Sequence, residues 1–176
     1  MEKFDLIIIT GLPGTGKTTL ARELARKYSL PLLSKDAIKE PLMAAQDCDP
    51  ERSRALSDAA FAVMFSVTKE FLAAGVRLIL EGNFRRGEHE APLLAAFPER
   101  GVTILQVLCK IPEPLRRSRM AARALDPTRH PGHRDAQQLE PVPACDSFLE
   151  LPGERMSACS DDAAGKSRAS CLRPTK

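Results

Sequence analysis

Residues 11–18 read GLPGTGKT and fit the pattern G-x-x-x-x-G-K-[ST]. The glycines of such a loop let the backbone turn tightly and aim its N–H groups inward, which forms a nest for anions. The lysine of the pattern reaches the β- and γ-phosphates of a nucleotide, and the hydroxyl after it binds Mg²⁺. We therefore predict ATP and Mg²⁺ as cofactors, Thr18 as a metal ligand, and a nucleotide-binding set that comprises Gly11, Pro13, Gly14, Thr15, Gly16, Lys17, Thr18 and Thr19.

Two apolar segments frame this loop and must position it. Residues 5–10 (DLIIIT) are short and rich in β-branched side chains, which predicts a buried parallel strand. Leu20, Leu24 and Tyr28 recur at helical spacing after the loop. A helix that begins at Lys17 would present its positive N-terminal end to the same phosphates. A glycine-rich turn without a ligand is the alternative, but strand, loop and helix in this order are the context that phosphate binding requires.

A phosphate chain held in this way can pass its terminal group to water or to another molecule, and Asp36 bears on that choice. It follows residues 31–33, a second strand candidate, and ligands of open parallel sheets gather at the carboxyl ends of the strands. Asp36 could accept the proton of an acceptor hydroxyl or hold that hydroxyl. It could equally occupy the first turn of a helix expected over 35–45, where a negative charge is favourable.

A second acid, Glu81, follows the strand expected over residues 76–80. It could hold Mg²⁺ through water or bind the acceptor, with Asn83 and Arg85 or Arg86 beside it. The alternative is a turn with solvated charges. Among the expected strands none ends in a conventional Asp, so Glu81 is the nearest equivalent. We name Asp36, Glu81, Asn83 and Arg85 as candidate substrate-binding residues.

Arginines recur at helical spacing in the segment 112–125, at positions 116, 119 and 123, so they share one helix face. Guanidinium groups folded over ATP would neutralise charge on the transferring oxygens. The following stretch, DPTRHPGHRD, is rich in Pro and Gly and suits a mobile lid that excludes water. An ordinary exposed basic face is the alternative for any single arginine.

The elements expected along the chain alternate between strand and helix. Besides those named, we expect helices over 51–75, 91–97 and 112–125 and a strand over 102–109. This order predicts an α/β fold of the P-loop NTPase type, a three-layer α/β/α sandwich around a mostly parallel sheet of four or five strands, with an Arg-rich lid. We predict a domain over 1–140, its lid over about 112–135, and a poorly structured tail over 141–176.

Composition narrows the class of protein. The chain has 176 residues, 43% hydrophobic and 28% charged, which favours one soluble domain. The net charge of +3 is small, and nucleic-acid domains tend to be more basic, so we do not expect a nucleic-acid partner. We expect a small-molecule substrate and a monomer or homodimer. Five cysteines without a C-x-x-C pair favour a reducing compartment. No signal peptide or membrane segment is expected, so we predict a cytoplasmic protein.

Four segments taken together, LIIITGLPGTGKTTLARELA, LLSKDAIKE, LILEGNFR and RHPGH, carry a resemblance. Over about residues 5–135 the chain resembles the small P-loop kinases of the AAA-family ATPase, zeta-toxin and chloramphenicol-phosphotransferase-like group. The resemblance implies phosphorylation of small hydroxylated molecules such as antibiotics, sugars and nucleotide sugars. It also implies Asp36 as the catalytic base, Glu81 and Asn83 in the acceptor pocket, and Arg119 and Arg129 as lid arginines.

The C-terminal end departs from this resemblance. Related chains usually supply a fifth strand and an adenine-contacting loop after a segment like residues 151–153. From Glu154 onward we expect neither, because the apolar run and the turn are both missing.

The resulting hypothesis is an ATP-dependent phosphotransferase that moves the γ-phosphate to a hydroxyl of a small molecule. Asp36, Lys17, Arg119 and Arg129 are its candidate catalytic residues. The alternatives are an ATPase or switch that acts through a protein partner, a polynucleotide 5′-hydroxyl kinase, and a nucleotide-binding protein without catalysis.

Overall fold

The computed structural model describes residues 4–45, 53–99, 101–127, 146–159 and 172–174. Within these residues the strands form one six-stranded sheet in the order β2-β3-β1-β4-β5-β6. β1 to β5 pair in parallel, and β6 pairs antiparallel with β5 at one edge. The strands are β1 (Leu6–Thr10), β2 (Leu32–Ser34), β3 (Leu78–Glu81), β4 (Ile104–Lys110), β5 (Glu154–Cys159) and β6 (Leu172–Pro174).

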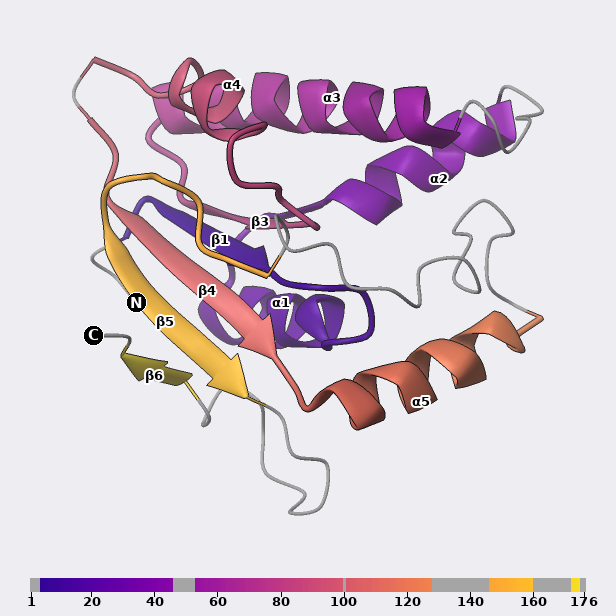
Figure 1. Cartoon of the computed structure of the whole chain (residues 1–176). Coiled ribbons are helices and arrows are strands. Elements are labelled where there is room, and N and C mark those ends of the chain that lie inside the picture. Colours follow the sequence, from indigo (N-terminus) through magenta and orange to yellow (C-terminus); the bar gives the residue numbers. More distant parts are fainter. Residues whose placement is uncertain (1–3, 46–52, 100, 128–145, 160–171, 175–176) are drawn as a thin grey trace.

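Helices cover both faces of this sheet, which confirms the predicted three-layer α/β/α architecture (Figure 1). One face carries the long α3 with α2 and α4, and the opposite face carries α1. α5 extends beyond the carboxyl ends of β1 and β4. The helices are α1 (Lys17–Tyr28), α2 (Lys35–Ala45), α3 (Ser53–Ala73), α4 (Glu90–Leu94) and α5 (Glu113–Ala124).

β1 lies at the centre because its side chains supply both cores. Every residue of this strand is buried. Leu6 and Ile8 pack in the cluster on the α3 side, whereas Ile7 and Ile9 pack in the cluster on the α1 side. A strand that is buried on both faces has a continuous run of apolar residues in its sequence, and residues 6–9 (LIII) form such a run.

The expectation that no strand follows Glu154 was wrong. β5 begins at that residue and pairs in parallel with β4, from Leu105↔Glu154 to Lys110↔Cys159. Its sequence, ERMSAC, lacks the β-branched side chains that favour strands, so its hydrogen-bonded neighbour decides its conformation. The boundary at residue 140 and the tail over 141–176 stay predictions, although β5 lies inside that segment.

A buried glutamine helps to fix the chain that leads into β5. Gln106 on β4 is fully buried. Its Oε1 accepts a hydrogen bond from the Leu149 N–H at 3.0 Å, and its Nε2 donates to the Leu151 carbonyl at 3.3 Å. Both leucines pack in the core on the α3 side. The segment before β5 is therefore tied to the sheet by polar and apolar contacts.

None of the described helices combines the length and the apolar character that a membrane-spanning segment requires. The lid expected over 112–135 is described only as far as residue 127.

Candidate active site

The phosphate loop joins β1 to α1 in a conformation that its glycines permit. Gly11 and Gly14 have φ values of 138° and 85°, a region that other residues rarely adopt. A Cβ on Gly11 would lie 2.5 Å from the Cys109 carbonyl oxygen, and one on Gly14 would lie 3.2 Å from Met120 Cγ. Glycine at both positions thus lets the loop pass close to β4 and α5.

The loop also closes on itself. The Thr15 hydroxyl donates to the Leu12 carbonyl at 2.8 Å, and Lys17 Nζ donates to the same oxygen at 3.4 Å. The lysine ammonium is therefore held above the loop, at the N-terminal end of α1, where backbone N–H groups favour anions. Loop, lysine and helix end together provide the positive environment that a phosphate chain needs.

Glu81, at the end of β3, is buried and lies against the start of α1. Its Oε1 accepts a hydrogen bond from the Thr18 hydroxyl at 3.2 Å, and its Oε2 accepts one from the Ser34 hydroxyl at 2.7 Å. The strand register explains this meeting, since Glu81 pairs with Ile9 on one side and with Ser34 on the other.

The Thr18 and Glu81 oxygens fit the Mg²⁺ that the loop motif implies. Magnesium is bound in such sites by one or two protein oxygens together with phosphates and waters. A hydroxyl and a carboxylate that already lie 3.2 Å apart at the phosphate loop are a donor set of this kind.

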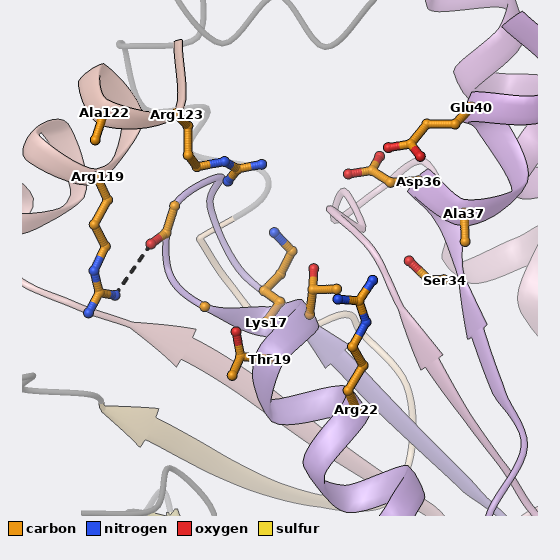
Figure 2. Close-up of a pocket in the computed structure, with 13 residues that line it drawn as sticks. Lys17, Thr19, Arg22, Ser34, Asp36, Ala37, Glu40, Arg119, Ala122 and Arg123 are labelled. Carbon is orange, nitrogen blue, oxygen red and sulfur yellow. Dashed lines mark hydrogen bonds between the residues drawn. The ribbon is translucent and has the colours of Figure 1, made fainter. Parts of the chain in front are cut away.

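A pocket of about 560 Å³ opens above the loop, between α2 and α5 (Figure 2). Its lining side chains come from the loop, α1, α2 and α5. They belong to Gly14, Gly16, Lys17, Thr18, Thr19, Arg22, Ser34, Asp36, Ala37, Glu40, Arg119, Ala122 and Arg123. The pocket thus brings together the phosphate loop and the candidate acid Asp36.

Asp36 occupies the first turn of α2, and its carboxylate is directed into the pocket (Figure 2). Its Oδ1 lies 2.9 Å from Lys35 Nζ. The Lys35 side chain is 9% exposed and that of Asp36 40% exposed, so the ion pair is buried on the lysine side and open on the aspartate side. The lysine is therefore placed to hold the carboxylate while leaving it accessible to a ligand.

The arginine face of α5 meets the phosphate loop. Arg119 Nη1 donates to the Gly14 carbonyl at 3.5 Å, and Arg123 lines the pocket one turn further along the helix. Arg116 is 1% exposed and donates to both Glu113 oxygens, at 2.7 and 2.9 Å. These bonds lower the pKa of Glu113 from its ordinary value of 4.5 to about 2. Arg116 is thus an anchor of α5 rather than part of an exposed basic face.

Three of the four candidate substrate residues do not line this pocket, and Glu81, which bonds to Thr18 and Ser34, is one of them. Asn83 and Arg85 follow β3 but do not line the pocket. Arg85 Nη1 pairs with Glu88 at 3.0 Å, and the Arg85 N–H donates to His89 Nδ1 at 2.7 Å. Arg129 lies outside the described residues.

Among the charged residues that line the pocket, sequence reasoning missed two, Arg22 and Glu40. Each lies four residues after a candidate, Arg22 after Thr18 and Glu40 after Asp36. Side chains four apart on a helix share a face, so helical spacing was the signal that could have found both.

Comparison with known proteins places this architecture in a family. Residues 6–142 match the family model described as AAA domain. The chain belongs to this family of AAA domains. The match spans the phosphate loop, β1 to β4 and the five helices found in the described part of the chain.

Two solved structures that are similar to this AAA domain are described as kinases. A presumed kinase from Chloroflexus aurantiacus is 30% identical, with a TM-score of 0.83, over 94% of this chain and 92% of that one. An unliganded sugar kinase from Janibacter is 19% identical, with a TM-score of 0.58, over 89% and 85% of the two chains. The second likeness shows the fold, and the first supports the resemblance to small P-loop kinases.

A curated relative matches over a short segment only. A cytidylate kinase of Pyrobaculum islandicum is 48% identical over 44 residues, which are 25% of this chain and 24% of that protein. The match therefore spans about a quarter of that kinase. The family match and the structure from Chloroflexus confirm the resemblance of this chain to the small P-loop kinases of the AAA-family group.

Proposed function

We propose that this AAA domain is a phosphotransferase that moves the γ-phosphoryl group of ATP to a hydroxyl of a small molecule. The observation that carries the proposal is that Lys17 and Asp36 line one pocket, the first above the phosphate loop and the second on α2. A switch or a simple ATPase needs only a placed water, whereas a carboxylate facing the phosphate site suits an incoming alcohol.

The phosphates of ATP would be held by the loop N–H groups and the Lys17 ammonium. Thr18 and Glu81 would hold Mg²⁺, and Ser34 would orient the Glu81 carboxylate through its hydrogen bond of 2.7 Å. When bound, the ion supplies positive charge that offsets the charge of the phosphate oxygens. This role for Glu81 is one of the two that its position after β3 left open.

Asp36 would accept the proton of the acceptor hydroxyl. The acceptor oxygen forms a bond to the γ-phosphorus while the bond from that phosphorus to the β–γ bridging oxygen breaks, and ADP leaves with the electron pair. Positioning of the two reactants accounts for most of the rate in such transfers. Lys35 would keep the carboxylate directed at the hydroxyl.

Arginines would stabilise the charge on the transferring group. Arg119 and Arg123 line the pocket, and such cations typically stabilise the equatorial oxygens of the transition state. Arg129 would join them from the lid. The roles of Asn83 and Arg85 in binding the acceptor stay predictions, because a substrate would have to reach beyond the described pocket to contact them. The cytoplasmic location and the monomeric or homodimeric state also stay predictions.

The test is transfer from γ-labelled ATP to a panel of antibiotics, sugars, nucleosides and oligonucleotides. We expect a labelled small molecule and a loss of at least about a hundredfold in the Asp36→Asn variant, because general bases typically contribute that much. Asp58→Asn, an exposed acid on α3, is the matched control and should keep full activity. Full transfer by Asp36→Asn, or labelled phosphate as the single product throughout the panel, would overturn the proposal.

A further inference from the structure

One side of the pocket is acidic, and it lies on a single helix. Asp36 and Glu40 are four residues apart on α2, and both line the pocket. Figure 2 shows the two carboxylates directed into the same space from that helix. The cations of the pocket, Lys17, Arg22, Arg119 and Arg123, come from α1 and α5 instead.

This division of charge separates the binding of the nucleotide from the binding of the acceptor. A nucleotide brings several negative charges and is attracted to the cations of α1 and α5. The α2 side would repel a second anion, because like charges that face one pocket disfavour each other. The acceptor must contact this side in order to reach Asp36. Its charge is therefore constrained by Glu40 as well as by Asp36.

We infer that the acceptor is a hydroxyl compound that carries a protonated amine, such as an amino sugar or another amino alcohol. The inference rests on the proposed function and names the substrate class of that same site. The hydroxyl lies at Asp36 and the ammonium at Glu40, where a hydrogen bond between two charged groups holds it. Glu40 is then a specificity-determining residue.

The spacing of the two carboxylates suits such a compound. Residues four apart on a helix have Cβ atoms about 5–6 Å apart. A hydroxyl and an amine on neighbouring carbons are about one hydrogen-bond length apart, so each can bond its own carboxylate. Lys35 supports Asp36 at 2.9 Å but does not line the pocket, so the lysine leaves this space to the ligand.

A dedicated metal site explains the pair less well. In the part of the chain that the structure describes, no group of three or more His, Cys, Asp or Glu side chains could hold a metal ion. Thr18 and Glu81, whose side-chain oxygens lie 3.2 Å apart beside the phosphate loop, are the pair proposed above for Mg²⁺. An organic ammonium needs only hydrogen-bond acceptors and opposite charge, which Glu40 and Asp36 supply.

The experiment compares acceptors that differ in charge. Purified full chain is given Mg²⁺ and ATP with an equimolar mixture of neutral, aminated and carboxylated forms of the same sugars, such as glucose, glucosamine and glucuronate, together with aminocyclitol antibiotics and their N-acetylated forms. Mass spectrometry identifies the phosphorylated products. We expect the amine-bearing members to be favoured by roughly ten- to a hundredfold, the range of a hydrogen bond to a charged group.

Variants of Glu40 test the residue itself. Glu40→Gln should remove most of the preference for the amine, and Glu40→Lys should shift it toward the neutral or carboxylated member. Glu70→Lys reverses an exposed acid on α3 that does not line the pocket, and it should keep the wild-type preference.

The outcomes separate the two proposals. Faster transfer to a neutral or carboxylated sugar than to its aminated form, or an unchanged preference in Glu40→Lys, overturns the amine inference and leaves the kinase proposal standing. ATP turnover with no phosphorylated member overturns both. Preferential phosphorylation of amines that depends on Glu40 supports both.

Discussion

The Glu81 carboxylate accepts a hydrogen bond from Thr18 at 3.2 Å, although 63 residues separate the two in the chain. Parallel pairing of β1 with β3 creates this contact, because it sets the end of β3 beside the start of the phosphate loop. A second bond, from Ser34, fixes the other carboxylate oxygen. Both oxygens of a buried acid are thus oriented at the position where the loop motif expects Mg²⁺.

The first prediction concerns Glu81→Gln. The amide keeps the shape and an acceptor oxygen but loses the charge that would attract Mg²⁺, so the Mg²⁺ concentration for half-maximal activity should rise about ten- to a hundredfold. A magnesium titration of ATP turnover measures this. Glu88→Gln, which changes an acid that pairs with Arg85 rather than with Thr18, is the control. An unchanged magnesium requirement would show that Glu81 does not act through the ion.

The second prediction concerns Lys35, which we propose as a positioning residue for Asp36. Lys35→Met keeps the buried stem but removes the ammonium 2.9 Å from the carboxylate. We expect kcat to fall roughly tenfold or more while the affinity for ATP stays unchanged, since a hydrogen bond to a charged group is lost away from the phosphate loop. Nucleotide titration and steady-state rates separate the two effects.

Lys69→Met, an exposed lysine on α3, is the matched control for that variant. Equal losses of ATP affinity and kcat in Lys35→Met would indicate a disturbed fold instead of a misdirected carboxylate. Partial recovery of kcat in Lys35→Arg, which restores a cation beside Asp36, would support positioning.

The predictions that agree with the structure are those based on neighbouring residues within one strand, loop or helix. The loop, the apolar run of β1 and the helical spacing of Leu20 and Leu24 depend on neighbouring residues, and the structure has each where it was expected. Such local patterns do not predict contacts between elements that are far apart in the chain. The sequence left Glu81 with two roles, and only the register of β3 against β1 and β2 shows that it meets Thr18 and Ser34.

β5 and Glu40 show two other limits of sequence reasoning. The strand has few β-formers, so its conformation comes from hydrogen bonds with β4, which no local pattern reports. Glu40 shares a helix face with Asp36 by spacing alone, but that this face lines the pocket depends on how α2 packs against α3. The conformation of β5 and the position of Glu40 therefore depend on pairing and packing between elements, which local propensity does not describe.

The third prediction concerns acid stability through Glu113. The pKa of this carboxyl is lowered from 4.5 to about 2, chiefly by its hydrogen bond with Arg116. A lowered pKa in the folded state adds stability that is fully present above pH 4.5 and is lost as the pH falls toward 2. Glu113→Gln should reduce the dependence of unfolding free energy on pH within this window. The effect should be modest, because the carboxylate is 40% exposed and water screens the pair.

Denaturant unfolding at several pH values between 5 and 2 checks this prediction, with Glu99→Gln, an exposed acid in a loop, as the control. An identical pH dependence in wild type and Glu113→Gln would contradict it.

The fourth prediction concerns His89, which lies before α4 and packs against three phenylalanines. Its ring centroid is 4.1 Å from that of Phe61, and its Nδ1 accepts a hydrogen bond from the Arg85 N–H at 2.7 Å. Burial lowers the pKa of His89 below 6.5. The unfolded chain therefore takes up a proton first as the pH falls, and the folded protein should lose stability from about pH 6.5 downward.

Asn is the informative replacement for His89, because its side-chain oxygen can accept the same backbone hydrogen bond but does not titrate. We expect wild type to lose unfolding free energy between pH 7.5 and 5.5, because burial lowers the pKa of the imidazole in the folded state. His89→Asn should lose less over that interval, from a lower starting value. Denaturant titrations monitored by circular dichroism at each pH measure both. A steeper loss in the variant than in wild type would mean that other groups, and not the buried imidazole, govern stability in this range.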